Sequence, residues 1–249
     1  MILSTSYEYD VAGNRTAVID RNNNRSEFAY DALNRLVWSR DAEGRVNTNR
    51  YDTQGRLEQS TVHFAVNGAA LAMGELPAAH AKDQTVSYVY DELGRVLEST
   101  RGGANGVSLT SYVEYNSFGE AVRQTDEAGA HSWMVYNKLG QVEAQINALG
   151  EVTSYVYDSH GNVVEQRVHA SRVEVAAADI EIDASRLAGL RSDTDRVVYS
   201  SFDKNNQLRF SIDAQGHVSE QIYDNLGQVV ETRRYSQPIV LANGQSSLS

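Results

Sequence analysis

Short stretches of six or seven residues, enriched in Val, Thr, Tyr and Leu, alternate along this chain with polar segments rich in turn-forming residues. Examples of the apolar-enriched stretches are residues 35–40, 46–51, 152–157 and 218–223. Strands of globular proteins commonly have this length and composition. The alternation therefore predicts a succession of β-strands joined by turns.

An aromatic residue followed by Asp or Asn, with Gly or Asn three positions beyond that polar residue, recurs at a nearly fixed spacing. The gaps between successive aromatic residues are 21, 21, 39, 25, 21, 21, 45 and 21 residues. Such a period indicates a repeat architecture, so a structural scaffold is favoured over a compact catalytic domain. The residues of this repeat signature are Tyr9, Asp10, Gly13, Tyr30, Asp31, Asn34, Tyr51, Asp52, Gly55, Tyr90, Asp91, Gly94, Tyr115, Asn116, Gly119, Tyr136, Asn137, Gly140, Tyr157, Asp158, Gly161, Phe202, Asp203, Asn206, Tyr223, Asp224 and Gly227.

A second turn signal follows the first by about ten residues in the regular units, at 20–23, 41–44, 126–129, 147–150 and 213–216. Asp or Asn at the first turn position accepts hydrogen bonds from the following backbone N–H groups, and Gly at the fourth adopts a positive φ. This chemistry suits a type I turn closed by a bulge. Each unit is therefore expected to contain two turns and two strands.

Chained hairpins of this kind predict an all-β fold, an antiparallel meander in a long curved or spiralling sheet. Successive signature aromatics should lie two strand spacings apart, roughly 9–10 Å. The residue six positions past each aromatic is the candidate to fill the gap on the strand between them. These candidates are Leu36, Leu57, Val96, Val142, Val163, Leu208 and Val229.

Two segments interrupt the period and are interpreted as insertions at turns, at about 63–86 and 168–198 of a single repeat segment, 1–249. The first contains Gly74 and Pro77 and is expected to be an extended surface loop. In the second, the spacing of Ile180, Ala184, Leu187 and Leu190 predicts one short amphipathic helix near 175–190. A smaller insertion at 102–106 is expected to form a flexible turn.

Composition and charge narrow the classes of function. A net charge of −11 and a pI near 5.0 argue against a nucleic-acid partner, which demands a basic surface. No apolar run approaches the roughly 20 residues that span a bilayer, and the first residues lack the features of a signal peptide. The chain contains no Cys, which excludes disulfides and thiolate metal sites within it.

No catalytic, cofactor-binding or metal-binding motif emerges, so the chain is predicted not to be an enzyme. The six His residues are scattered without ligand spacing. Asp193 and Asp195 are expected on an acidic surface loop, and Ser108 and Ser111 lack a nucleophile elbow. The Arg residues that follow turns are expected to pair with the turn carboxylates, and the turn carboxylates themselves to be caps rather than calcium ligands.

The heptapeptides at 9–15, 30–36, 51–57, 90–96 and 157–163 resemble the YD repeats of the Rhs-repeat family. Similar repeats build the B–C component of bacterial Tc insecticidal toxins and, more distantly, the extracellular region of teneurins. The resemblance implies a hollow β-shell that encloses a C-terminal toxin or other polypeptide cargo and is itself non-enzymatic. It also implies a secreted or cell-surface bacterial protein whose partners are the remainder of its own shell and the enclosed cargo.

The self-cleaving, core-closing segment of the toxin-releasing members has no counterpart here. We therefore expect a portion of a larger polypeptide, with terminal strands whose open edges favour self-association. Because Tyr-lined surfaces also bind sugars and peptides, a cell-surface adhesion or carbohydrate- or protein-binding module remains the alternative.

Overall fold

The computed structural model describes residues 4–64, 71–102 and 106–239. These residues form eighteen β-strands and one 3-10 helix, and the all-β antiparallel meander predicted from the repeat is confirmed. The elements are β1 (Ser6–Tyr9), β2 (Arg15–Ile19), β3 (Arg25–Tyr30), β4 (Leu36–Arg40), β5 (Val46–Tyr51), β6 (Leu57–Val62), β7 (Gln84–Tyr90), β8 (Val96–Gly102), β9 (Ser108–Tyr115), β10 (Ala121–Thr125), β11 (His131–Tyr136), β12 (Val142–Ile146), β13 (Glu151–Tyr157), β14 (Val163–Arg172), η2 (Ala184–Leu187), β15 (Arg196–Phe202), β16 (Leu208–Ile212), β17 (Val218–Tyr223) and β18 (Val229–Arg234).

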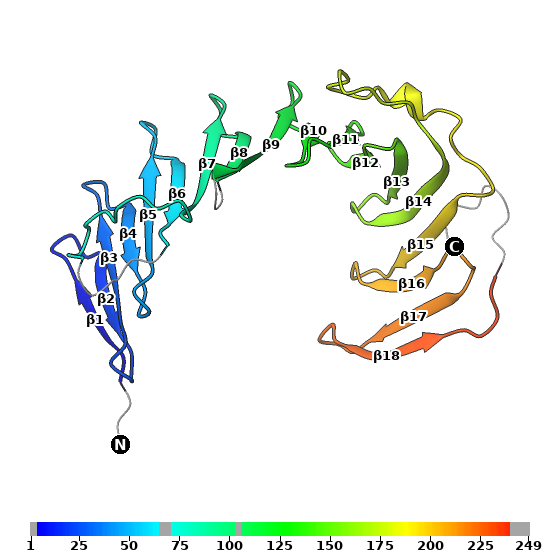
Figure 1. The fold of residues 1–249 in the computed structure, drawn as a ribbon. Coiled ribbons are helices and arrows are strands. Elements are labelled where there is room, and N and C mark those ends of the chain that lie inside the picture. Colours follow the sequence, from blue (N-terminus) through cyan, green and yellow to red (C-terminus); the bar gives the residue numbers. More distant parts are fainter. Residues whose placement is uncertain (1–3, 65–70, 103–105, 240–249) are drawn as a thin grey trace. The chain divides into compact units, whose positions relative to one another are not determined.

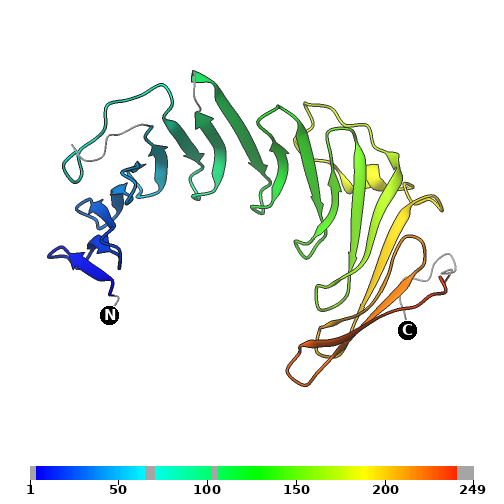
Figure 2. The same cartoon turned by 60° about the horizontal axis from the view of Figure 1, so that its bottom comes forward.

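The chain divides into two compact units, Met1–Val113 with Asp126–Gly129 and Glu114–Thr125 with Ala130–Ser249. In each unit the strands lie side by side in sequence order, and every strand runs antiparallel to its predecessor (Figures 1 and 2). The treatment of 1–249 as a single repeat segment stays a prediction.

The strand register explains the constant length of the repeat. Each signature aromatic from Tyr30 onward, wherever its register is described, pairs with the residue six positions later, as Tyr30 does with Leu36 and Tyr157 with Val163. The register shifts by one residue beside each of these pairs, so the turn closes with a bulge. The same pairing recurs for the remaining gap-filling candidates, Leu57, Val96, Val142, Leu208 and Val229.

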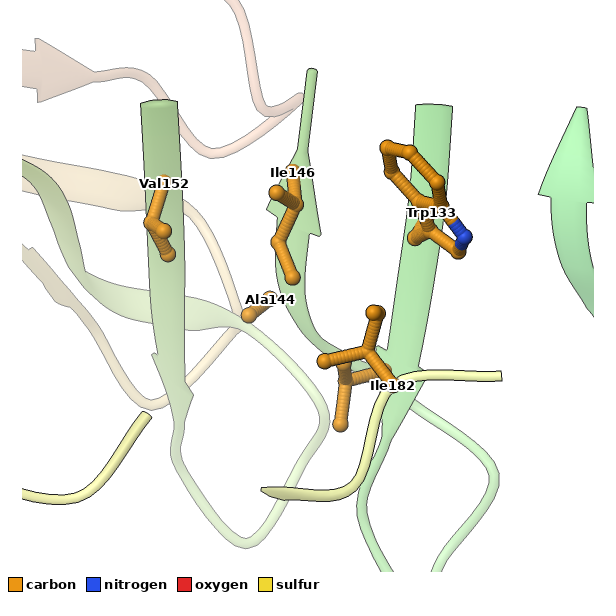
Figure 3. Close-up of a cluster of buried hydrophobic side chains, with 6 residues drawn as sticks. Trp133, Ala144, Ile146, Val152 and Ile182 are labelled. Atoms are coloured by element: carbon orange, nitrogen blue, oxygen red, sulfur yellow. The ribbon is translucent and has the colours of Figure 1, made fainter. Parts of the chain in front are cut away.

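Side chains alternate between the two faces of a strand, so each of the two compact units buries one stripe of residues on one face of its sheet. In the second unit the cluster consists of Trp133, Val135, Ala144, Ile146 and Val152 on β11–β13, together with Ile182 from the second insertion (Figure 3). In the first unit the largest fully buried side chain is Trp38 on β4. A single sheet layer needs a second layer to bury such residues, and the insertions supply it.

The second insertion contains less helix than the sequence suggested. Its only helical element is η2, four residues long, with Asp183 as N-cap. Ile182 is the buried residue of this segment, whereas Ile180 is 55% exposed. The extended backbone at Ala188, followed by Gly189 with a φ of 80°, ends the helix after one turn. Within the first insertion, residues 71–83 form turns without a strand, and residues 65–70 lie outside the described residues.

Candidate functional site

The signature turns share one hydrogen-bonding pattern. In each, the N–H of the fourth residue donates to the carbonyl of the turn Asp or Asn, and the N–H of that Asp or Asn donates to the carbonyl four residues on. For Asp31 both distances are 3.0 Å. The fourth residue has a positive φ throughout, at 61° for Asn34 and 86° for Gly55. Gly and Asn tolerate this conformation best, which accounts for their place in the signature.

The turn side chain completes the same structure. The Asp31 Oδ1 atom accepts from the N–H groups of Leu33 and Arg35, each at 2.9 Å, and the equivalent pair of bonds is present in the other signature turns. The backbone N–H of Arg35 is the main cause that lowers the pKa of Asp31, and the Arg35 side chain adds to it. Asn116 and Asn137 make the same bonds without a charge, so the capping role of this position does not depend on a carboxylate.

The signature tyrosine joins one repeat to the one before it. The Tyr51 hydroxyl donates to the Leu36 carbonyl at 2.9 Å, and Leu36 is the partner of the preceding signature aromatic, Tyr30. The same bond links Tyr30 to Arg15, Tyr90 to Leu57, Tyr136 to Ala121, Tyr157 to Val142 and Tyr223 to Leu208, at 2.8–3.2 Å. Tyr90 reaches Leu57 although the first insertion lies between them in sequence.

A tyrosine hydroxyl is protonated at neutral pH and can donate to the carbonyl of the preceding repeat, because phenols ionise only at about pH 10. Burial raises the pKa of Tyr90, Tyr136 and Tyr157 further. The hydrogen bond joins each of these tyrosines to the preceding repeat.

The residue four positions past the turn acid reaches in the opposite direction, to the next repeat. Arg56 donates through Nε to Asp52 at 2.7 Å and through NH1 to the Asp91 carbonyl at 2.8 Å. Its guanidinium lies 4.6 Å from the centre of the Tyr90 ring, as that of Arg35 does over Tyr51. Such stacking contributes about 0.5–1 kcal/mol at exposed sites. One face of the Tyr51 ring and one face of the Tyr90 ring are therefore covered by an arginine.

At several turns the side chain at this position also lies close to the fourth residue of the next turn. A Cβ atom on Gly140 would lie 3.1 Å from the Glu120 carboxylate, and one on Gly227 would lie 3.0 Å from the Gln207 amide. Where Asn replaces Gly at Asn34, its side chain instead accepts a bond from Asn14 at 2.8 Å. The fourth turn position thus meets two demands, a positive φ and contact with the preceding repeat.

Each insertion covers a tryptophan and satisfies its indole N–H. The Trp38 Nε1 atom donates to the Glu75 carbonyl at 2.9 Å, and Trp133 donates to the Asp179 carbonyl at 2.8 Å. An arginine beside each tryptophan donates to a second carbonyl of the insertion, Arg40 to Leu71 at 3.0 Å and Arg123 to Ala177 at 2.7 Å.

A buried histidine and aspartate lie at the base of each insertion. His63 contacts the Thr48 hydroxyl through Nε2 at 2.9 Å and lies 3.5 Å from Asp83 through Nδ1. His169 contacts Ser154 at 2.8 Å and lies 3.4 Å from Asp195 in the same way. The side chains of His169 and Asp195 are 5% and 0% exposed.

Neither histidine–aspartate pair was predicted from the sequence. Asp193 is exposed as expected, but the expectation that Asp195 lies on an acidic surface loop is wrong. Its carboxylate accepts from the backbone N–H groups of Ala170 and Ser192 and from Arg167. Burial works to raise the pKa of Asp195, but these hydrogen bonds outweigh it and hold the pKa below its ordinary value. Ala170 and Asp195 are 25 residues apart, and no sequence pattern predicts that two residues at such a separation are in contact.

Within the described ranges, no cluster of three or more His, Asp or Glu side chains is arranged to hold a metal ion. In the same part of the chain, no helix is long and apolar enough to cross a membrane. The hydrogen bonds described for the signature side chains are made within their own turn or to a neighbouring repeat.

Comparison with known proteins gives a family and a set of structural neighbours. The model of the RHS Repeat family matches residues 9–46 and 136–173, and no curated protein matches the sequence. The crystal structure of TcdB2-TccC3 without its hypervariable C-terminal region is 15% identical, with a TM-score of 0.49, over 94% of this chain and 14% of that chain.

Two other structures give similar values. TcdB2-TccC3-Cdc42 is 12% identical, with a TM-score of 0.44, over 94% of this chain and 14% of that chain. The Photorhabdus luminescens Tc holotoxin pore is 12% identical, with a TM-score of 0.35, over 92% of this chain and 16% of that chain. This chain thus spans about a seventh of the length of these neighbours. Because the TM-scores are below 0.5, the resemblance to the Rhs-repeat, or YD-repeat, family rests on the recurring signature and on the two stretches that the family model matches: this chain carries RHS repeats at 9–46 and 136–173.

Proposed function

We propose that this chain is a structural, non-enzymatic stretch of wall in a larger β-shell that encloses a toxin or another polypeptide cargo. The observation that carries the proposal is how the signature residues are used. The tyrosine hydroxyls bind the preceding repeat and the turn carboxylates bind their own turns. Side chains so occupied build a continuous surface and leave little for a substrate.

The proposed mechanism is passive exclusion. A sheet whose every strand is hydrogen-bonded to its neighbours presents no unpaired backbone to a protease or a partner on its two faces. The remainder of the shell and the enclosed cargo would be the partners, in a secreted or cell-surface protein of bacterial origin.

Cysteine labelling provides a direct test, and these 249 residues contribute no thiol of their own to the background. Ser200 and Ser201 are successive residues of β15, so their side chains point to opposite faces. In the natural gene product that contains these repeats, Ser200→Cys and Ser201→Cys form a matched pair for labelling. We expect a small maleimide to label both and a polymer-bearing maleimide to label only the one on the outer face. Equal labelling of both by the bulky reagent would contradict an enclosing wall.

The rival function, an adhesion or carbohydrate-binding module, predicts a different result. Exposed aromatic side chains are available for it, among them Phe118 at 87% and Tyr112 at 46% exposure. Saturable glycan binding by the chain that is lost in Phe118→Ala or Tyr112→Ala would favour the rival. We expect no such binding, because the regularly repeated tyrosines are already engaged.

A further inference from the structure

The second insertion lies over the buried stripe of its unit. Residues 173–195, called the strap below, contribute Ile182 to the cluster formed by Trp133, Ala144, Ile146 and Val152 (Figure 3). Ile182 is the one strap residue within that buried cluster, and Val173, Val175, Leu187 and Leu190 pack against the cluster while only partly buried. Apart from these residues and the buried carboxylate of Asp195, most of the strap is exposed. Segments with few buried apolar contacts open at lower free energy than the strands of a core.

The strap is tied to the sheet mainly through side chains. The backbone bond that joins them runs from the Val173 N–H to the Gly150 carbonyl at 2.9 Å. In the middle, Trp133 and Arg123 donate to strap carbonyls. The strands beneath, β10 to β14, pair with one another through their own ladders and need no strap residue for that pairing.

The strap ends at the His169–Asp195 pair, called the latch below. Asp195 holds the chain on both sides, since its carboxylate accepts from Ala170 at 2.9 Å and from Ser192 at 3.0 Å. His169 connects this carboxylate to Ser154 on β13. The Nδ1 atom of His169 is buried and makes no hydrogen bond, so its contact with Asp195 is the weakest link of the latch.

Charged groups around the latch balance one another. Arg167 lies 3.2 Å from Asp195 and 3.0 Å from Glu165, and Arg191 lies 3.1 Å from Glu165. Burial works to lower the pKa of Arg167, but Glu165 and Asp195 raise it, and the electrostatic interaction with Tyr199 also contributes to raising it. Ser154, His169 and Asp195 have the order of a hydrolase triad, but a nucleophile must face a space that admits substrate. The burial of His169 and Asp195 makes the arrangement a structural tie instead.

The first unit repeats the latch atom for atom. Asp83 precedes β7 as Asp195 precedes β15, and it accepts from the residue after the histidine, Phe64, at 2.8 Å. It also accepts from the residue three positions before itself, His80, at 2.9 Å. His63 Nδ1 is likewise buried without a hydrogen bond. The same device with different neighbouring side chains indicates that the latch is a specific feature and not an accident of one loop.

We propose that the strap is a hinged cover: it opens as one element at the His169–Asp195 latch and uncovers Trp133, while the strands beneath it stay paired. His169 and Asp195 are positioning residues of this cover. Opening would transiently present an apolar surface of Trp133, Ile146 and Val152 on one face of the sheet.

The test compares His169→Ala with His160→Ala in the full chain, since His160 lies exposed in a turn of the same unit. We expect His169→Ala to raise the rate of tryptic cleavage at Arg186 and Arg191 about tenfold, the usual effect of losing one buried polar contact. Hydrogen exchange of β11–β13 should stay unchanged, and His160→Ala should change neither quantity.

The unaltered chain provides a second measurement that does not depend on any variant folding. Strap amides such as those of Ala176 and Asp179 should exchange faster than the amides of β12 by a similar factor. Equal exchange of strap and strands, or a rise in strand exchange that matches the rise in cleavage, would show that the strap is an inseparable part of the core. No change in His169→Ala would show that the latch does not hold the strap.

Discussion

The signature tyrosine has a role that one atom can test. Tyr157→Phe keeps the ring and removes only the hydroxyl that donates to Val142 at 2.8 Å. The carbonyl left behind is part-buried, so we expect a loss of about 1 kcal/mol in the free energy of unfolding. Tyr155→Phe is the control, because its hydroxyl bonds to Gln145 in an exposed position. Urea denaturation should show a shift within about 0.5 kcal/mol for the control.

Two glycines separate backbone conformation from packing. Gly129 and Gly150 occupy equivalent turn positions with φ values of 81° and 76°. A Cβ on Gly129 meets nothing within 4 Å, whereas a Cβ on Gly150 would lie 2.1 Å from the Val173 carbonyl oxygen. Gly129→Ala should therefore cost about 1–2 kcal/mol of stability through φ alone.

Gly150→Ala should cost roughly 1–3 kcal/mol more, because the strap must move away from the turn. Thermal or urea unfolding of the two variants measures the difference. An equal cost would mean that the start of the strap adjusts freely.

At the scale of the element, the features that depend on residues close together in the sequence could be predicted. The hairpins follow from residues within one turn, such as Asp31 and Asn34, and the predicted pairing partners of the aromatics follow from turn length. The strap and its latch depend on contacts between segments far apart in sequence, such as Trp133 with Asp179. The apolar spacing predicted that Ile180 would lie on the apolar face of a helix, but it is Ile182 that is buried against the sheet.

Those two isoleucines provide a matched pair for the strap. Ile182 is 3% exposed and Ile180 is 55% exposed. Ile182→Ala should reduce the free energy of unfolding by about 2–4 kcal/mol, because it removes a side chain from the buried cluster. Ile180→Ala should stay within about 0.5 kcal/mol. A similar small effect from both would mean that the strap contributes little to the core.

At the scale of the whole molecule, the turn carboxylates link stability to pH. Backbone N–H groups, or the side chains of neighbouring residues, hold the pKa of Asp10, Asp31, Asp91 and Asp158 below the ordinary value of 3.8. A group with a lowered pKa stabilises the folded state above its unfolded pKa, and this stabilisation disappears as the pH falls through the folded pKa.

We therefore expect these groups to leave the urea midpoint concentration unchanged near pH 7. At pH values below about 3.8 we expect the midpoint concentration to decrease. Asp31→Asn with Asp158→Asn should fold, as the natural Asn116 and Asn137 turns do, and should reduce the slope in acid. An unchanged acid slope would contradict the role given to these carboxylates.

Among the described contacts, the signature residues interact within their own repeat or with an adjoining repeat, as Tyr51 does with Leu36 and Arg56 with Tyr90. Stability in such an array is a sum of intrinsic and neighbour terms. A gene can then gain or lose one whole period, and every surviving tyrosine still finds a carbonyl to bind. The length of the sheet can for this reason change by duplication or deletion of whole repeats, without a change in any remaining repeat.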